Sequence, residues 1–222
     1  MPAALLRRNF VALGAASLLV CPNSSGSAQH GGMRIDIGKN GVGVPPDDFH
    51  FWQTGGGAPG RWSVIRDPTA SEGLAIEQFS SDTTENRFPL AIYKPILSKN
   101  LKVRTRFKIV SGRMRIAGIA FRLTSASQYY VVAASALETR VDLFSILDGK
   151  MKRIAGVDAE VATDKWHALT VVAEEDHFII SFEGRRLFTA SDPSIGDKGY
   201  AALWTNEDNV TRFDELVIAA GP

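Results

Sequence analysis

Residues 101–109 read LKVRTRFKI, a stretch in which apolar and charged side chains alternate. Leu101, Val103, Phe107 and Ile109 fall on one face of an extended chain, and the lysines and arginines between them fall on the other. A period of two residues is that of a β-strand with one buried and one wet face. This stretch therefore predicts a strand rather than a helix.

The same period continues along the rest of the chain. Asp148-Gly149 and Glu183-Gly184 are two-residue hairpin signals, because glycine accepts the positive φ that a tight reversal needs. Strands that recur about every 8–12 residues without a helical pattern predict an all-β fold, an antiparallel sandwich of two sheets. The period of two begins at Trp62, and the further predicted strands cover residues 114–123, 129–134, 140–146, 166–173, 178–182, 200–204 and 211–218.

Length and composition are those of a folded single domain. The chain has 222 residues, of which 45% are hydrophobic and 22% charged. Disorder over the whole length and a polytopic membrane protein are excluded. Twenty-five basic residues against 24 acidic ones give a net charge of +1, so no charge excess indicates nucleic acid or an anionic membrane as a partner. The single cysteine, Cys21, excludes an internal disulfide.

The N-terminus has the order of an export signal. Arg7-Arg8 precede the short apolar run 13–20, and small residues at Gly26 and Ala28 suit peptidase cleavage. The Arg-Arg-x-Phe-Val core resembles a twin-arginine signal, so residues 1–28 are predicted to direct the protein to the periplasm or outside the cell. No membrane attachment is then expected after cleavage. A lipid anchor on Cys21 is the alternative.

Residues 29–60 are predicted to be a glycine-rich lead-in, with one short strand at Met33–Ile37. The run Gly55–Gly60 reads GGGAPG, and no helix pattern follows it, so it is interpreted as a connecting loop rather than a phosphate loop. The sandwich itself is predicted for residues 61–220.

Several short segments resemble the concanavalin A-like lectin/glucanase superfamily, and more specifically bacterial exported proteins related to the 3-keto-disaccharide hydrolase domain family. The resemblance covers about residues 50–219. The segments that carry it are WSV at 62–64, LAI at 74–76, GIAFR at 118–122, QYYVV at 128–132, ALE at 136–138, DG at 148–149, WHAL at 166–169, FEG at 182–184, GYAALWT at 199–205 and FDE at 213–215.

The resemblance implies two facing sheets, one of them concave, with carbohydrate as the usual ligand in the concave groove. That family commonly carries an arginine soon after the paired tyrosines. Here Ala133-Ala134-Ser135 follow instead, which weakens any inherited catalytic or anion-binding role.

Aromatic rings stack on the apolar faces of sugars, and Arg or Glu bonds their hydroxyls. The candidate groove residues are Arg122, Tyr130, Glu138, Arg140 and Trp204. Arg122 interrupts an apolar strand, so it needs a carboxylate partner or a ligand, and Glu138 is the natural partner. A purely structural Arg122–Glu138 pair is the alternative. No cluster of catalytic residues is assigned.

The one metal candidate is a structural Ca²⁺ ion. Asp214 resembles the position that binds this ion in relatives, and Asp47 or Asp48 is expected to help hold it. The alternative is that Asp214 caps backbone amides. His167 follows Trp166 at a strand start, where packing and hydrogen bonding are the favoured interpretation. The Glu-x-Asp-x-x-Glu run of laminarinase-type enzymes is absent from the sequence.

Three functions remain open from the sequence. The first is an exported domain that binds a carbohydrate or a related polyol. The second is a 3-keto-glycoside lyase or hydrolase, in which one base and one electrophile replace the usual pair of carboxylates. The third is a non-catalytic structural or interaction domain, which Ala133 favours. The sequence gives no oligomeric state.

Overall fold

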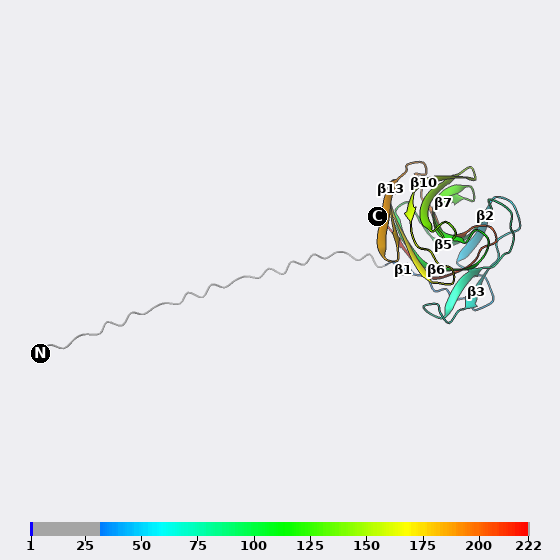
Figure 1. Cartoon of the computed structure of the whole chain (residues 1–222), viewed down its shortest axis with the longest axis horizontal. Helices are drawn as coiled ribbons and strands as arrows, with labels where there is room; N and C mark the ends of the chain where they lie inside the picture. The colour runs from blue at the N-terminus through cyan, green and yellow to red at the C-terminus, as the bar shows by residue number, and fades with distance from the viewer. Residues whose placement is uncertain (2–31, 222) are drawn as a thin grey trace. The chain divides into compact units, whose positions relative to one another are not determined.

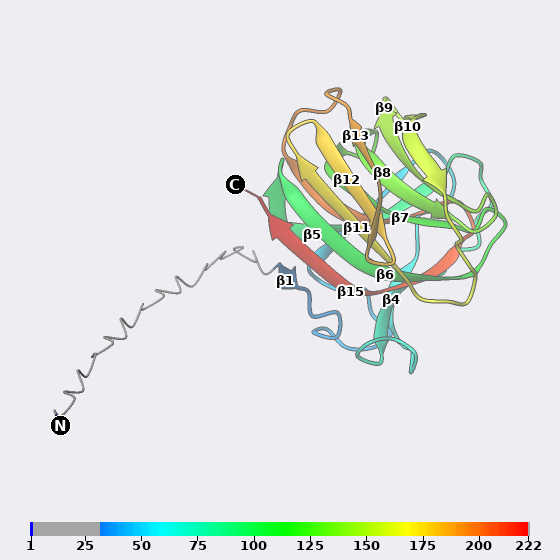
Figure 2. The ribbon, with the colours of Figure 1, turned by 60° about the vertical axis from the view of Figure 1, so that its left-hand side comes forward.

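The computed structural model describes Met1 and residues 32–221, which fold into two antiparallel β-sheets that face each other (Figures 1 and 2). Within this part of the chain no α-helix forms, and so no helix is long and apolar enough to cross a bilayer. The export signal predicted for residues 1–28 and Cys21 lie outside the described residues, apart from Met1.

One sheet has eight strands and the other seven. The first has the order β13 (Arg185–Ser191), β12 (His177–Phe182), β11 (His167–Glu174), β6 (Leu101–Ser111), β15 (Val210–Ala220), β4 (Leu74–Gln78) and β3 (Trp62–Arg66), and β1 (Met33–Arg34) also pairs with β15. The second has the order β10 (Lys150–Asp158), β9 (Arg140–Leu147), β8 (Gln128–Ser135), β7 (Ile116–Ser125), β14 (Gly199–Thr205), β5 (Phe88–Ser98) and β2 (Phe49–Thr54).

The all-β sandwich predicted from the sequence is confirmed. The predicted strands appear within a few residues of their expected bounds, from β6 to β15. Both predicted hairpin turns form as well, with positive φ at Asp148 and Gly149 and again at Glu183 and Gly184. The prediction missed β2, β4, β5, β10 and β13.

The lead-in is part of the sandwich rather than a segment before it. The predicted short strand forms as β1, although it covers two residues only. Strand β2 pairs with β5 from Phe49 to Thr54 and closes one edge of the seven-stranded sheet. Residues before position 61 therefore belong to the β-sandwich.

Two apolar clusters lie on opposite faces of the seven-stranded sheet. In β7, Ala117, Ile119 and Phe121 belong to the cluster between the sheets, so the alternate residue Ala120 faces outward. Outward-facing residues of β5, β8 and β14 join Ala120 in the second cluster. Thr54 of the edge strand β2 reaches this cluster, since its Oγ1 lies 2.7 Å from the Tyr129 hydroxyl.

The alternation in β6 puts its cations on the outer face of the eight-stranded sheet, as predicted. Three of the four bond carboxylates: Arg104 bonds Glu215 at 2.9 Å, Arg106 meets Asp214 at 3.3 Å, and Lys108 bonds Asp67 at 2.6 Å. Burial alone would raise the pKa of Asp67, but hydrogen bonds from Lys108, Thr69 and Arg212 hold it well below its ordinary value.

Candidate functional site

The outer face of the seven-stranded sheet carries a charged cluster on β9 and β10, the two strands at one edge (Figure 2). Val141 and Leu143 of β9 point into the core between the sheets, so Asp142 between them points outward. Asp142 accepts hydrogen bonds from Arg140 Nε at 2.6 Å and from Arg153 Nε at 2.7 Å. We call Arg140, Asp142 and Arg153 the arginine–aspartate site.

The backbone around this site makes room for the carboxylate. Gly156 of β10 lies opposite Asp142, and a Cβ there would stand 1.8 Å from Asp142 Oδ1. A β-bulge between Arg153 and Ala155 shifts the register. With this shift Arg153 lies opposite Phe144, from where it reaches back to Asp142. The site therefore depends on a glycine and a bulge as well as on its charges.

The two arginines differ from the aspartate in their access to solvent. The Asp142 side chain is 5% exposed, whereas those of Arg140 and Arg153 are 27% and 48% exposed. The hydrogen bond that Arg140 donates to Asp142 raises the pKa of Arg140 above its ordinary value. One buried negative charge thus holds two guanidinium groups in place, and parts of both remain open to a ligand.

Small side chains continue from the site across the sheet. Asp142 lies opposite Ala133, which lies opposite Gly118, and Gly118 lies opposite Trp204. A Cβ at Gly118 would stand 2.3 Å from the carbonyl oxygen of Val132, so position 118 has no space for a side chain. The residues next to the arginine–aspartate site on the outer face, Ala133 and Gly118, are therefore small, and half-buried Phe144 lies opposite Arg153.

Of the five predicted groove residues, Arg122 is fully buried and plays a structural part. Its guanidinium donates to the backbone carbonyls of Lys99, Ile195 and Glu175, and its Cζ lies 5.2 Å from the centre of the Phe178 ring. Burial lowers the pKa of Arg122. The expected partner was a carboxylate, but backbone carbonyls take that place.

Glu138 is exposed in the turn after β8, and its backbone N–H donates a hydrogen bond to Ser135 Oγ. The predicted Arg122–Glu138 pair is wrong because of register. Phe121 lies opposite Tyr130 near the start of β8, so Arg122 sits at the end of the strand away from Glu138.

Tyr130 and Trp204 are buried as well, on opposite faces of the sheet. The Tyr130 hydroxyl donates to Asp192 Oδ1 at 2.7 Å and accepts from the Ile195 N–H at 2.9 Å, inside the sandwich. Trp204 packs 5.2 Å from Phe88 in the outer cluster. The structure therefore does not bring the five predicted residues into one groove, and only Arg140 lies in the arginine–aspartate site.

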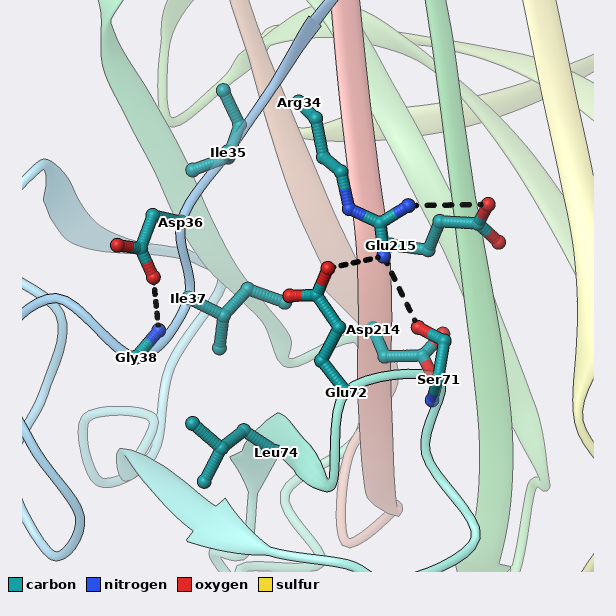
Figure 3. A pocket seen from close by; sticks show the side chains of 10 residues that line it. All are labelled: Arg34, Ile35, Asp36, Ile37, Gly38, Ser71, Glu72, Leu74, Asp214 and Glu215. Atoms are coloured by element: carbon teal, nitrogen blue, oxygen red, sulfur yellow. Dashed lines mark hydrogen bonds and ion pairs between the residues drawn. The ribbon is translucent and has the colours of Figure 1, made fainter.

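Asp214, the predicted calcium ligand, lines a small pocket of about 100 Å³ (Figure 3). Its Oδ2 accepts from the Ser71 N–H at 2.7 Å and meets Arg106 at 3.3 Å, while its buried Oδ1 has no hydrogen-bond partner. Burial raises the pKa of Asp214. The carboxylates around the same pocket are already engaged, because Arg34 bonds both Glu72 and Glu215.

The residues around this pocket offer too few free oxygen ligands for a calcium ion. Ca²⁺ takes six to eight oxygen ligands, and among the described side chains no group of three or more His, Cys, Asp or Glu could hold a metal ion. Asp47 and Asp48 bond Asn40 and Lys39 instead. The donor set does not fit a calcium site, although Asp214 Oδ1 is one oxygen that a cation would meet.

We expect EDTA to leave the melting temperature of the purified protein unchanged, because the guanidinium groups of Arg106 and Arg34 already bring positive charge to this pocket. Thermal unfolding in EDTA, in calcium and in neither checks this. A melting temperature that falls in EDTA and recovers with calcium would instead establish the calcium site predicted from the sequence.

A larger pocket, of about 560 Å³, surrounds His167 at the start of β11. The His167 ring stacks on Phe182 at 5.2 Å, its Nδ1 lies 2.8 Å from Glu183 Oε1, and its Nε2 lies 3.0 Å from the Ala162 N–H. Both ring nitrogens thus have protein partners. His167 acts in packing and hydrogen bonding, as the sequence indicated.

Two antiparallel sheets that face each other define a β-sandwich, a fold shared with solved carbohydrate-binding-module and galectin-like structures. The model of the galactocerebrosidase C-terminal lectin domain family matches residues 97–221, more than half of the 222 residues. The chain belongs to this family. The resemblance to the 3-keto-disaccharide hydrolase family is not supported by this match. No curated protein matches the sequence.

Solved structures share the fold at low sequence identity. The carbohydrate-binding module CBM66 from Bacillus subtilis is 19% identical with a TM-score of 0.61, covering 80% of this chain and 99% of its own. A galectin-like protein of unknown function from Bacillus subtilis is 9% identical with a TM-score of 0.54, covering 76% and 88%. Domain 4 of AbnA, an arabinanase from Geobacillus stearothermophilus solved with arabinotriose, is 12% identical with a TM-score of 0.51, covering 77% and 82%.

Proposed function

We propose that this protein binds a carbohydrate on the outer face of its seven-stranded sheet, at the arginine–aspartate site. The observation that carries the proposal is the pair of half-open guanidinium groups that Asp142 holds on this face. The resemblance predicted a ligand groove on a concave sheet, and we propose that the seven-stranded sheet carries this groove.

The chemistry of the site suits sugar hydroxyls. Guanidinium N–H groups donate in a fixed fork, so the exposed parts of Arg140 and Arg153 can donate to neighbouring hydroxyl oxygens of one sugar ring. Phe144 beside the site offers a ring for the apolar face of the sugar. The lectin family of the chain supports the same ligand class, as do the carbohydrate-binding module and the arabinotriose-bound domain that share its fold.

Replacing Arg153 with alanine is expected to weaken glycan binding about 10- to 100-fold, the loss that one charged hydrogen-bonding group typically causes. Because the side chain is half exposed, the fold should be unaffected. A glycan array with the purified protein finds the ligand, and titration calorimetry with the best glycan measures the affinity of each variant.

Arg186→Ala is the matched control, since Arg186 is an exposed arginine on β13 of the other sheet. It should bind like the unchanged protein. Equal affinity of the Arg153→Ala and Arg186→Ala variants for the glycan would remove the arginine–aspartate site, and an array without any bound glycan would remove the proposed function.

The two alternative functions have less support. A 3-keto-glycoside lyase or hydrolase needs a base, but both nitrogens of His167 in the large pocket are bonded to the protein. A structural or interaction domain would not need two partly exposed arginines held by a buried aspartate. Export to the periplasm or outside the cell stays a prediction, and it would place this protein where free glycans occur.

A further inference from the structure

The edge strands β2 and β3 of the two sheets lie on the same side of the sandwich (Figure 1). A cavity of about 380 Å³ is lined by residues of both strands and of the loops beside them. Phe51 comes from β2, Trp62 from β3, and Phe79 follows β4. The lead-in closes one side, because Gly43 and Val44 form backbone hydrogen bonds with Val64 at 2.8 and 2.9 Å. Strands β2 and β10 are opposite edges of the seven-stranded sheet, so this cavity is separate from the arginine–aspartate site.

Aromatic rings form the walls of this edge cavity. The rings of Phe51 and Trp62 stack at 6.1 Å with 26° between their planes. The Arg61 guanidinium lies 4.6 Å from the centre of the Phe79 ring, and the Arg61 side chain is otherwise exposed. The cavity therefore combines apolar ring faces with an available cation.

One polar atom in the cavity wall lacks a partner. Trp62 is 4% exposed, and its buried Nε1 makes no hydrogen bond within the described structure. A buried donor without an acceptor is costly, so native structures rarely keep one without a reason. Gly60 lies close against this nitrogen. A Cβ at position 60 would stand 2.9 Å from Trp62 Nε1 and 2.7 Å from Pro89 Cβ, so there is no space for a larger residue.

We propose that the edge cavity is a second carbohydrate site that takes a single sugar ring. The inference rests on the proposed function for its ligand class and on its own geometry for the place. Arg61 is an exposed donor beside the aromatic rings, so the ligand must bring acceptor oxygens together with an apolar face, as a sugar ring does. A volume of about 380 Å³ is at the lower end of ligand pockets, which fits one ring rather than a chain.

The test uses the indole N–H signals of the four tryptophans in a ¹H–¹⁵N spectrum of the labelled, purified protein. Trp62→Phe removes one signal and so assigns it. Galactose, arabinotriose and maltotriose are titrated into the unchanged protein and into Arg153→Ala. We expect at least one of these sugars to shift the Trp62 signal in both proteins, with the same affinity.

Arg61→Ala, combined with Arg153→Ala, should weaken that shift about three- to tenfold, the effect of one hydrogen bond to a charged group at an exposed position. Because Arg61 is exposed, this variant is expected to fold, and weakening of whichever indole shift the sugar causes in Arg153→Ala tests the site even if Trp62→Phe does not fold. Arg66→Ala is the matched control, an exposed arginine at the end of β3 outside the cavity, and should change nothing.

A Trp62 signal that none of the three sugars moves overturns the second site, whatever happens at Arg153. A signal that a proline-rich peptide moves and the sugars do not overturns it too. Loss of glycan binding at the arginine–aspartate site with a persisting Trp62 shift would remove only the first site, so the two proposals fail separately.

Discussion

Replacing Arg122 with methionine is expected to lower the free energy of unfolding by about 3–5 kcal/mol, because each buried acceptor that loses its donor typically costs about 1–3 kcal/mol. Methionine fills much of the same volume but donates no hydrogen bond. The carbonyls of Lys99, Ile195 and Glu175, which come from three separate parts of the chain, would each lose a donor. Urea unfolding of both proteins gives the difference.

Arg186→Met is the control for this variant, because Arg186 is exposed and its replacement should change the free energy of unfolding by about 0.5 kcal/mol or less. If Arg122→Met were as stable as this control, the three carbonyls would have to find other donors and the structural role of Arg122 would be wrong. Glycan binding by the folded fraction should be unchanged, since Arg122 lies away from the arginine–aspartate site.

Trp204→Ala is the second change with a large expected effect, a loss of about 3–5 kcal/mol in the free energy of unfolding. Trp204 is 1% exposed, packs against Phe88, and donates from Nε1 to the Tyr129 hydroxyl at 3.3 Å. Truncation leaves a large cavity in the outer cluster and takes one hydrogen bond from Tyr129, whose pKa burial raises to about 12.

Thermal and urea unfolding measure this loss, and Trp204→Phe, which keeps a ring, should lose clearly less. The sequence placed Trp204 in a ligand groove, where truncation would weaken glycan binding at normal stability. That opposite pattern, a stable Trp204→Ala protein with weakened binding, would show that the ring is a binding platform after all.

A strand such as β6, whose two faces differ, follows directly from the sequence, whereas β5, β10 and β13 lack that pattern and were missed. In β6 the cations and apolar residues alternate, so its face and approximate bounds follow directly from the pattern. Strand β5 is buried on both faces over Phe88–Tyr93 and contains Pro89 and Pro95, so no alternation appears. Strands β10 and β13 lie at sheet edges and are largely exposed, which removes the apolar half of the pattern.

The candidate site was harder to predict, because it depends on register. Asp142 interrupts the apolar residues of β9 just as Arg122 interrupts those of β7, and this signal could have been used for both. That Arg153 reaches Asp142 follows from a β-bulge and from Gly156, which no pattern of residue types reveals. The partners of Arg122 are backbone carbonyls, so no side chain in the sequence could indicate them.

The open edges at β10 and β13 have a consequence for contacts between copies of the chain. An edge strand offers free backbone groups on which another molecule can add a strand. Exposed Lys150, Lys152 and Arg153 on one edge, and Arg185 and Arg186 on the other, would bring like charges together when two such edges meet. We expect this repulsion to disfavour edge-to-edge pairing between copies of the chain.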